Sequence, residues 1–506
     1  MADRPGAPAR IRASLALAWR TLRSMRTALI LLLVLALAAV AGSLVPQQDF
    51  PGAAAEIARL HRDHPFRAEL FQRLGLFDVY GSWWFTLIYT LLLISLAACL
   101  FPRTRALLRN LLARPVLVRE VDGFRHYAER PLAGEPDAAL SRARRVLRRR
   151  RFRVRGPEDA TIAAEKGLLR EIGSLAFHWS FFLLLIGVIY GRGTGFTGTA
   201  VIAEGETWAE IHAGYDGSAR EGRFFSEDHS GLLVHVRDFE VRYRPDLTPE
   251  EFTTRADLAG PDGTSLGAVD IRVNHPASAL GVKLYQAGYG WAPVVRVERE
   301  GEPIADAPLI TLQPPAAEGE DPRTLPWRGI LRLPSLRPQV AIVFELYPDG
   351  LAALASLQGG RPLPMVENRN PFLTFEAYRG DLPETAAFTL DSLDISGMSE
   401  FASGLVGEGD EEDLGDGVTL AFPELREYTV LQVSRDRGLW IMLAAGILIL
   451  LGLLPALYDS RRRLWVRAER SGEGTVLKVG GFALQRRDQF EEEFARVVDE
   501  LAGVDR

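Results

Sequence analysis

A single histidine lies inside a long apolar stretch of the chain. His178 is the eighth residue of EIGSLAFHWSFFLLLIGVIYG, which runs from Glu171 to Gly191. A helix of about 20 residues matches the roughly 30 Å hydrocarbon core of a bilayer. If the crossing begins near Ile172, His178 lies about 9 Å inside it. An ionisable ring there is costly unless it faces protein, water or a ligand, so His178 is the first candidate for ligand or metal binding.

Small residues recur along the same stretch and indicate how His178 is held. They are Gly173, Ser180, Gly187 and Gly191. Small side chains allow a second helix to approach closely within a membrane. We therefore expect His178 to lie at a seam between two membrane helices.

The other histidines have weaker contexts. His275 lies in Val-Asn-His-Pro, and Asn-His-Pro favours a turn, so a turn residue is a better interpretation than a ligand contact. His61 and His64 lie between the first two apolar runs, where they would approach a ligand only at the outer face. No motif surrounds three further histidines, His212, His229 and His235.

The only cysteine, Cys99, excludes an intrachain disulfide and any Cys-x-x-Cys or Cys/His zinc motif. A small, buried apolar residue is a better interpretation of Cys99 than a reactive thiol. We find no Ser/His/Asp arrangement or metal–water site, so no catalytic residue is predicted.

Four apolar runs divide the chain, and each is long enough to span a membrane. The runs are 27–45, 83–101, 172–191 and 438–458, and they separate segments 1–26, 46–82, 102–171, 192–437 and 459–506. Residues 1–26 contain six Arg and one acidic residue, and 102–171 contain 18 basic residues, whereas 46–82 contain four Arg. Because positive charge favours the cytoplasmic side, 1–26, 102–171 and 459–506 are predicted inside and 46–82 and 192–437 outside.

The first apolar run has a second interpretation. Basic residues, an apolar stretch and Ala39-Val40-Ala41 before Gly42 resemble a cleavable signal peptide. A retained helix is favoured because the charge pattern then alternates consistently over four spans.

The long segment 192–437 is predicted to be an antiparallel β-rich domain, because period-two alternation recurs in it. In LLVHVRDFEVRY, the apolar phase changes near Arg237-Asp238, which predicts a β-bulge. The acidic stretch 407–417 lacks calcium-loop spacing and is predicted to be a solvated loop.

The basic segment 102–171 reads as a helix followed by a strand, so a small α/β domain is expected on the inner side. The cluster Arg149–Arg151 favours a solvated or lipid-facing surface, since no nucleic-acid-binding motif accompanies it. The tail is predicted to contain a short strand and a final amphipathic helix from Gln489 to Leu501.

Several motifs, in order and at matching intervals, resemble the ResB-type cytochrome c biogenesis proteins. They are GSLVPQ, LGLFDVYGSWWF, Cys99 at the end of the second run, AEKGLLREIGSLAFHWS, VNHPASALGVKLYQAGYG and YTVLQVSRDRG. The resemblance covers about 40–190, 270–290 and 425–460. It implies a four-helix protein of the bacterial cytoplasmic (inner) membrane, with its large domain on the periplasmic side.

The resemblance also implies a function in the System II pathway. Such proteins work with a multi-span, ResC- or CcsA-like partner that carries a Trp-rich haem-handling motif, which this chain lacks. Together they export haem b as a transported substrate, keep it reduced and attach it to Cys-x-x-Cys-His of apocytochrome c. The chain would then be a subunit of a cytochrome c haem lyase or synthase, with no independent catalytic site.

The site residues implied by the resemblance centre on His178 as an axial ligand of haem iron. Phe177, Trp179 and Phe181 would line the haem pocket, and His275 is a further, weaker candidate for haem contact. One imidazole leaves the second axial position to another ligand, most simply a histidine of the partner.

Other functional classes remain as alternatives. A membrane scaffold without haem contact would dock apocytochrome c or brace the partner, and His178→Gln would then retain function. A receptor is disfavoured because the segments predicted inside contain no recognisable signalling module. A transporter is disfavoured because four spans without an inverted repeat give little room for alternating access.

Overall fold

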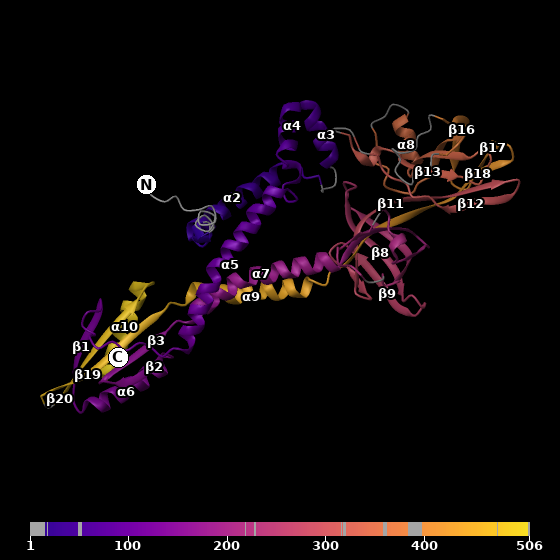
Figure 1. The fold of residues 1–506 in the computed structure, drawn as a ribbon. Helices are drawn as coiled ribbons and strands as arrows, with labels where there is room; N and C mark the ends of the chain where they lie inside the picture. The colour runs from indigo at the N-terminus through magenta and orange to yellow at the C-terminus, as the bar shows by residue number, and fades with distance from the viewer. Residues whose placement is uncertain are drawn as a thin grey trace, which may run out of the picture. The chain divides into compact units, whose positions relative to one another are not determined.

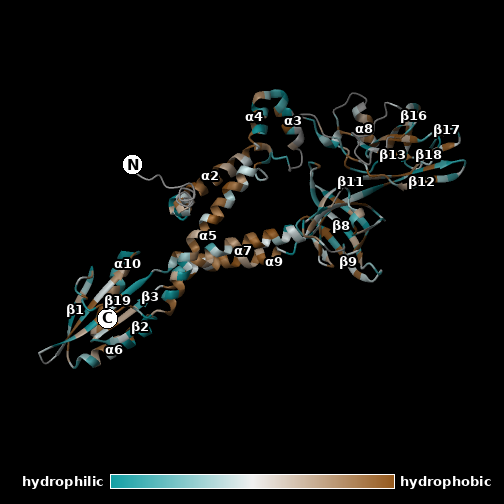
Figure 2. Cartoon of the chain, viewed as in Figure 1, coloured by the Kyte–Doolittle hydropathy of each residue, from teal (hydrophilic) through white to brown (hydrophobic). Residues whose placement is uncertain are grey.

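The computed structural model describes residues 16–17, 19–48, 53–217, 219–226, 229–314, 316, 320–357, 362–382, 397–472 and 474–503. The chain divides into two compact units, Met1–Ile186 with Trp440–Arg506, and Gly187–Leu439. In the described residues, four helices are long and apolar enough to cross a membrane: α2 (Met25–Leu44), α5 (Trp83–Leu112), α7 (Leu169–Thr194) and α9 (Leu439–Tyr458). Figure 1 labels them, and the colours of Figure 2 show that they consist largely of hydrophobic residues. The four helices and a large β-rich unit confirm the predicted class of membrane protein.

The first two apolar helices form a pair with short helices between them. The side chains of Ser24 and Ser82 accept hydrogen bonds from Thr27 N–H and Phe85 N–H, which caps α2 and α5 at their N-termini. The connecting residues form α3 (Ala53–Asp63), α4 (Pro65–Arg73) and η1 (Leu76–Asp78). Helix α5 continues through Pro102 to Leu112, because one proline removes a single backbone hydrogen bond without ending this helix.

Helix α5 contacts the chain at the start of α2 through two polar side chains. Ser95 Oγ donates to the carbonyl oxygen of Leu22 over 2.5 Å, and Cys99 Sγ donates to that of Arg23 over 3.2 Å. Cys99 therefore acts as a small, partly buried packing residue with a weak hydrogen bond.

Two segments distant in sequence combine into one five-stranded antiparallel sheet, here called the α/β domain. The strand order is β1-β20-β19-β3-β2. Strands β1 (His126–Leu132), β2 (Arg153–Glu158) and β3 (Thr161–Lys166) precede α7, whereas β19 (Arg462–Ser471) and β20 (Gly474–Ala483) follow α9. Figure 1 shows the purple and yellow strands side by side.

Two amphipathic helices cover the α/β domain, as the sequence predicts. Helix α6 (Pro136–Arg149) contributes Leu140 and Leu147, and α10 (Arg487–Ala502) contributes Phe490 to one buried core with the sheet. Segments 102–171 and 459–506 thus fold together into one domain, although the sequence predicts their elements separately.

In the second unit, here called the β domain, the described residues form three antiparallel sheets. A seven-stranded sheet has β4 (Phe196–Ala203), β6 (Arg220–Glu221), β10 (Ala277–Ala279), β11 (Val282–Arg299), β12 (Glu302–Pro308), β17 (Glu411–Gly415) and β18 (Val418–Arg435). A four-stranded sheet has β5 (Thr207–Ala209), β7 (Leu233–Tyr243), β8 (Pro249–Ala259) and β9 (Ser265–Arg272). The second four-stranded sheet has β13 (Trp327–Leu333), β14 (Val340–Tyr347), β15 (Phe372–Arg379) and β16 (Ser399–Gly407). The short helices of this unit are η2 (His212–Gly214), η3 (Pro322–Thr324) and α8 (Gly350–Leu357).

The long paired strands β11 and β18 contribute to two separate hydrophobic cores. Val297 and Leu420 belong to the core that includes β13–β16, whereas Leu284 and Leu431 belong to the core that includes β7–β9. Each small sheet therefore buries its apolar face against a different end of the same strand pair.

Two sequence predictions in the β domain have opposite outcomes. The register of β7 with β8 shifts between Val236 and Asp238, which confirms the predicted bulge. The acidic stretch 407–417 is wrongly predicted as a loop, because Glu411–Gly415 forms strand β17 and pairs with β18. An edge strand tolerates consecutive acidic residues because its outer side faces solvent.

Helices α7 and α9 approach each other through glycine, as the small residues of α7 predict. A Cβ atom at Gly452 would lie 2.7 Å from the carbonyl oxygen of Gly173 and 2.7 Å from Phe177 N. Both distances are shorter than carbon contacts allow, so the two backbones touch only because Gly452 has no side chain.

This contact predicts that Gly452→Ala lowers the stability of the full chain, because the helices must separate to admit one methyl group. Gly446→Ala on the same helix is the matched control, since a Cβ there meets nothing within 4 Å. We expect a clear fall in the thermal unfolding temperature in detergent for Gly452→Ala and none for Gly446→Ala. Equal unfolding temperatures for the two variants would contradict the contact.

Glu427, a carboxyl group in β18, predicts that the stability of the folded chain depends on pH. Burial, and the nearby carboxylate of Glu204, raise the pKa of Glu427 to about 8. The folded chain therefore binds this proton more tightly than the unfolded chain, so this stabilising contribution is lost as the pH rises towards about 8. Glu427→Gln should show a smaller loss of thermal stability between about pH 6 and about pH 9 than wild type. Glu424→Gln, at an exposed position of the same strand, should lose as much thermal stability over this pH range as wild type. The role of Glu427 is contradicted if Glu427→Gln also loses as much thermal stability as wild type.

Candidate functional site

The imidazole of His178 is half-buried and has one hydrogen bond, made to its own helix. Nδ1 lies 2.6 Å from the carbonyl oxygen of Ser174, one turn earlier. A carbonyl only accepts, so Nδ1 carries the proton and the neutral ring keeps a lone pair on Nε2. In the part of the chain that the structure describes, Nε2 has no hydrogen-bond partner. A histidine that ligates a metal has this arrangement, with one nitrogen fixed by a carbonyl and the other available.

His178 lies on a different side of α7 from the glycine that contacts α9. Gly173 is buried against α9, and Ser180 is also buried. At about 100° per residue, His178 lies roughly 140° around the helix from Gly173 and roughly 160° from Ser180. The small residues hold the two helices together, and His178 lies on a different side of α7.

The three predicted pocket aromatics divide between two sides of α7. Phe177 packs edge-on against His178 and against Phe181, with ring centroids 5.1 Å apart in both pairs. Trp179 instead faces α5, where its Nε1–H donates to Thr104 Oγ1 over 3.0 Å and its ring meets Phe101 edge-on. The structure therefore brings Phe177 and Phe181 together with His178, but not Trp179.

A pocket of about 350 Å³ opens next to the turn that holds His178. It is lined by Arg103, Ala106, Leu107, Arg170, Glu171, Ser174, Leu175 and Ala456. Glu171 pairs with Arg461 over 2.8 Å, which offsets its negative charge. The two arginines that line the pocket thus favour an anionic group one helical turn from the imidazole.

His275 lies in an exposed turn, as Asn-His-Pro predicts. Its backbone N–H donates to the carbonyl oxygen of Arg272 over 2.9 Å, and Asn274 has a φ of 63°. The ring Nδ1 lies 3.2 Å from the carbonyl oxygen of Val273. These contacts fix the shape of the turn and bring no aromatic partner to the ring within the described residues.

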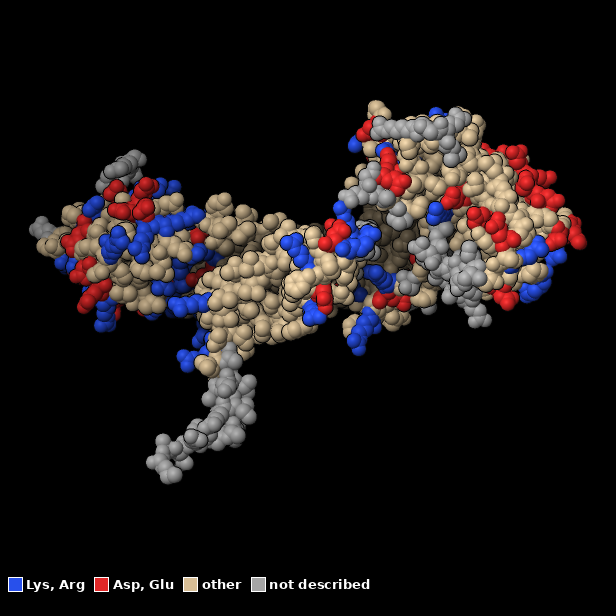
Figure 3. Space-filling view, turned by 90° about the horizontal axis from the view of Figure 1, so that it is seen from above, with Lys and Arg blue, Asp and Glu red and all other residues tan. Residues whose placement is uncertain are grey.

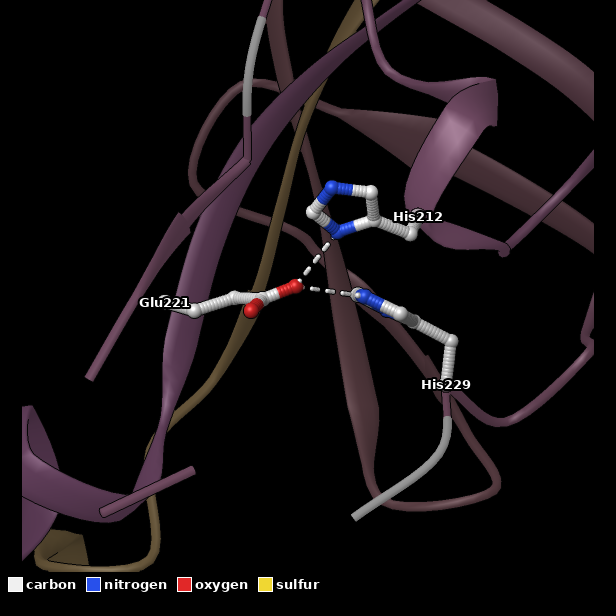
Figure 4. A group of neighbouring side chains, drawn as sticks. All are labelled: His212, Glu221 and His229. Carbon is white, nitrogen blue, oxygen red and sulfur yellow. Dashed lines mark hydrogen bonds and ion pairs between the residues drawn. The ribbon is translucent and has the colours of Figure 1, made fainter. Parts of the chain in front are cut away.

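Two other histidines come together in a way that the sequence does not indicate. His212 and His229 meet at Glu221 in the β domain (Figure 4). Glu221 lies nine residues after His212 and eight before His229, and neither interval matches a metal-binding motif. Only the folded chain brings the three side chains together. His235 lies apart from them and contacts Thr207 Oγ1 over 3.0 Å.

Comparison with known proteins agrees with the motifs. Residues 25–495 match the ResB-like family. The chain is 27% identical to the cytochrome c biogenesis protein CcsB of Trichormus variabilis over 488 residues, covering 95% of this chain and 92% of the relative. It is 27% identical to CcsB of Nostoc sp. over 487 residues, covering 95% and 91%, and 26% identical to CcsB of Synechococcus sp. over 500 residues, covering 95% and 89%. The chain therefore belongs to the ResB-like family.

Proposed function

We propose that the chain acts in cytochrome c biogenesis, as a subunit of a membrane complex that exports haem and attaches it to apocytochrome c. In this proposal His178 is an axial ligand of the haem iron, and haem b is the transported substrate. The observation that carries the proposal is the available Nε2 lone pair of His178 at membrane depth. The names of the related proteins support the pathway.

The surroundings of His178 suit a porphyrin. Phe177 and Phe181 offer an apolar surface beside the imidazole, which matches the apolar face of the ring. The haem propionates are anionic, and Arg103 and Arg170 line the pocket one turn away. Trp179 would act indirectly, since its bond to Thr104 sets the rotation of α7 against α5.

The strand pairing supports the proposed orientation in the bacterial inner membrane. Strands β3 and β19 pair from Lys166 with Arg462 to Thr161 with Arg467, so the residues before α7 and after α9 lie on the same side of the membrane. The high Arg content of 102–171 favours the cytoplasm for that side. The β domain between α7 and α9 then lies in the periplasm. Figure 3 shows the helical stretch with few charged residues.

The remaining components would come from outside the chain. His178 supplies one axial nitrogen, so a multi-span, ResC- or CcsA-like partner with a Trp-rich motif would supply the other. Thioether formation requires the thiols of Cys-x-x-Cys-His near the haem vinyl groups. The chain's own part is to ligate and orient the haem, and the reactivity belongs to the haem.

We expect the complex of this chain with its partner to show a haem Soret band that His178→Ala weakens. Added imidazole should restore the band, because a free ligand can fill the space left by the side chain. His235→Ala, which removes a histidine of the β domain, should leave the spectrum unchanged.

A scaffold without haem contact predicts a different result. Unchanged spectra and unchanged cytochrome c maturation in His178→Ala and His178→Gln would contradict the ligand role. The chain would then brace the partner or dock apocytochrome c.

A further inference from the structure

Three side chains of the β domain converge on one point. His212 comes from η2, Glu221 ends β6, and His229 lies in the segment between β6 and β7 (Figure 4). His212 Nδ1 lies 2.7 Å and His229 Nε2 lies 3.1 Å from the same carboxylate oxygen of Glu221. The three potential ligand atoms lie within 4.8 Å of one another.

A buried carboxylate fixes the orientation of His229 from behind. Glu210 is fully buried and accepts from Tyr215 OH over 2.6 Å and from Ser230 Oγ over 2.7 Å. It also binds Ser230 N–H and His229 Nδ1. These contacts fix the Glu210 carboxylate behind the imidazole of His229.

Aromatic packing holds the same imidazole in place. The ring of His229 packs against Phe196, Tyr215 and Phe225, with centroids 4.9, 5.6 and 5.5 Å away. Its side chain is only 8% exposed, whereas that of His212 is 70% exposed. His229 is thus held rigidly, whereas His212 lies at the surface, where an ion can enter.

Both ring nitrogens of His229 face carboxylates. Nδ1 contacts the buried carboxylate of Glu210, and Nε2 lies 3.1 Å from Glu221 Oε1. The same oxygen of Glu221 also contacts His212 Nδ1. A cation at this point would therefore meet ligand atoms from all three side chains.

We propose that His212, Glu221 and His229 bind a divalent transition-metal ion of the zinc type. Two imidazole nitrogens and one carboxylate oxygen are ligands that Zn²⁺ prefers. The carboxylate–imidazole spacings of 2.7 and 3.1 Å are shorter than the roughly 3.4 Å expected between ligands about 2.1 Å from a tetrahedral ion, so the side chains would move slightly apart to admit it. Glu210 supplies the outer carboxylate that commonly orients a metal-binding histidine. Three protein ligands would leave a fourth position for water or for an external imidazole or thiolate.

The test is zinc titration of the full-length chain in detergent, purified without a histidine tag and stripped with a chelator. Calorimetry should show one Zn²⁺ per wild-type chain. His212→Ala should weaken the affinity at least tenfold, and Glu210→Gln by about 10- to 100-fold, as for other outer carboxylates. His235→Ala, on the neighbouring strand β7, is the matched control and should bind as wild type.

A second measurement separates metal binding from folding. Because Glu210 is buried, its variant is interpreted together with Glu221→Gln, which changes a more accessible side chain and should also lose zinc. Zinc should raise the unfolding temperature of wild type but not of His212→Ala. The proposal is overturned if the stripped wild type takes up no zinc, or if His212→Ala and Glu221→Gln bind zinc as tightly as wild type.

Discussion

The backbone contact between α7 and α9 is the constraint on which the arrangement of the chain depends. Gly452 meets the backbone of α7 at Gly173, and neither position leaves room for a side chain. A strand precedes and a strand follows each of these helices in the sequence, and the strands flanking α7 pair with those flanking α9. Lys166 of β3 pairs with Arg462 of β19, and Phe196 of β4 pairs with Arg435 of β18. Each compact unit thus contains an antiparallel pair of strands, one next to α7 and the other next to α9 in the sequence.

The same contact determines which side of α7 remains for function. One side of the helix is used for α9, and Trp179 directs another towards α5 through Thr104. The imidazole of His178 lies on a different side from Gly173, hydrogen-bonds Ser174 and packs against the ring of Phe177, both of its own helix. The half-buried ring is therefore oriented by this chain and available to a component from outside it. This placement suits the proposed role of the chain as a haem-handling subunit that works with a partner.

The parts of the fold that depend on local pattern are predictable from the sequence. The four apolar runs predict helices, and the change of phase near Arg237 predicts a bulge that the structure confirms. The amphipathic tail likewise predicts α10. Small residues at intervals along α7 correctly predict a close helix neighbour, because close approach requires them regardless of the partner.

Features that depend on contacts distant in sequence are not predictable in this way. Pairing of β3 with β19 joins residues about 300 positions apart, and no local signal marks it. Residue types around His178 suggest one aromatic pocket, but only the rotation of α7 shows that Trp179 faces away from Phe177. The three members of the proposed zinc site have no motif spacing, and the folding of η2 and β6 brings them together.

The central claim is that Nε2 of His178 binds haem iron. Its most direct test is the reduction potential of haem bound to the complex of this chain with its partner, measured for wild type and for His178→Met. A thioether in place of an imidazole raises the potential, because the axial ligand tunes the iron. We predict a higher potential and an altered axial-ligand spectrum in the variant. Haem bound with the same potential and the same spectrum in both proteins would contradict ligation by His178.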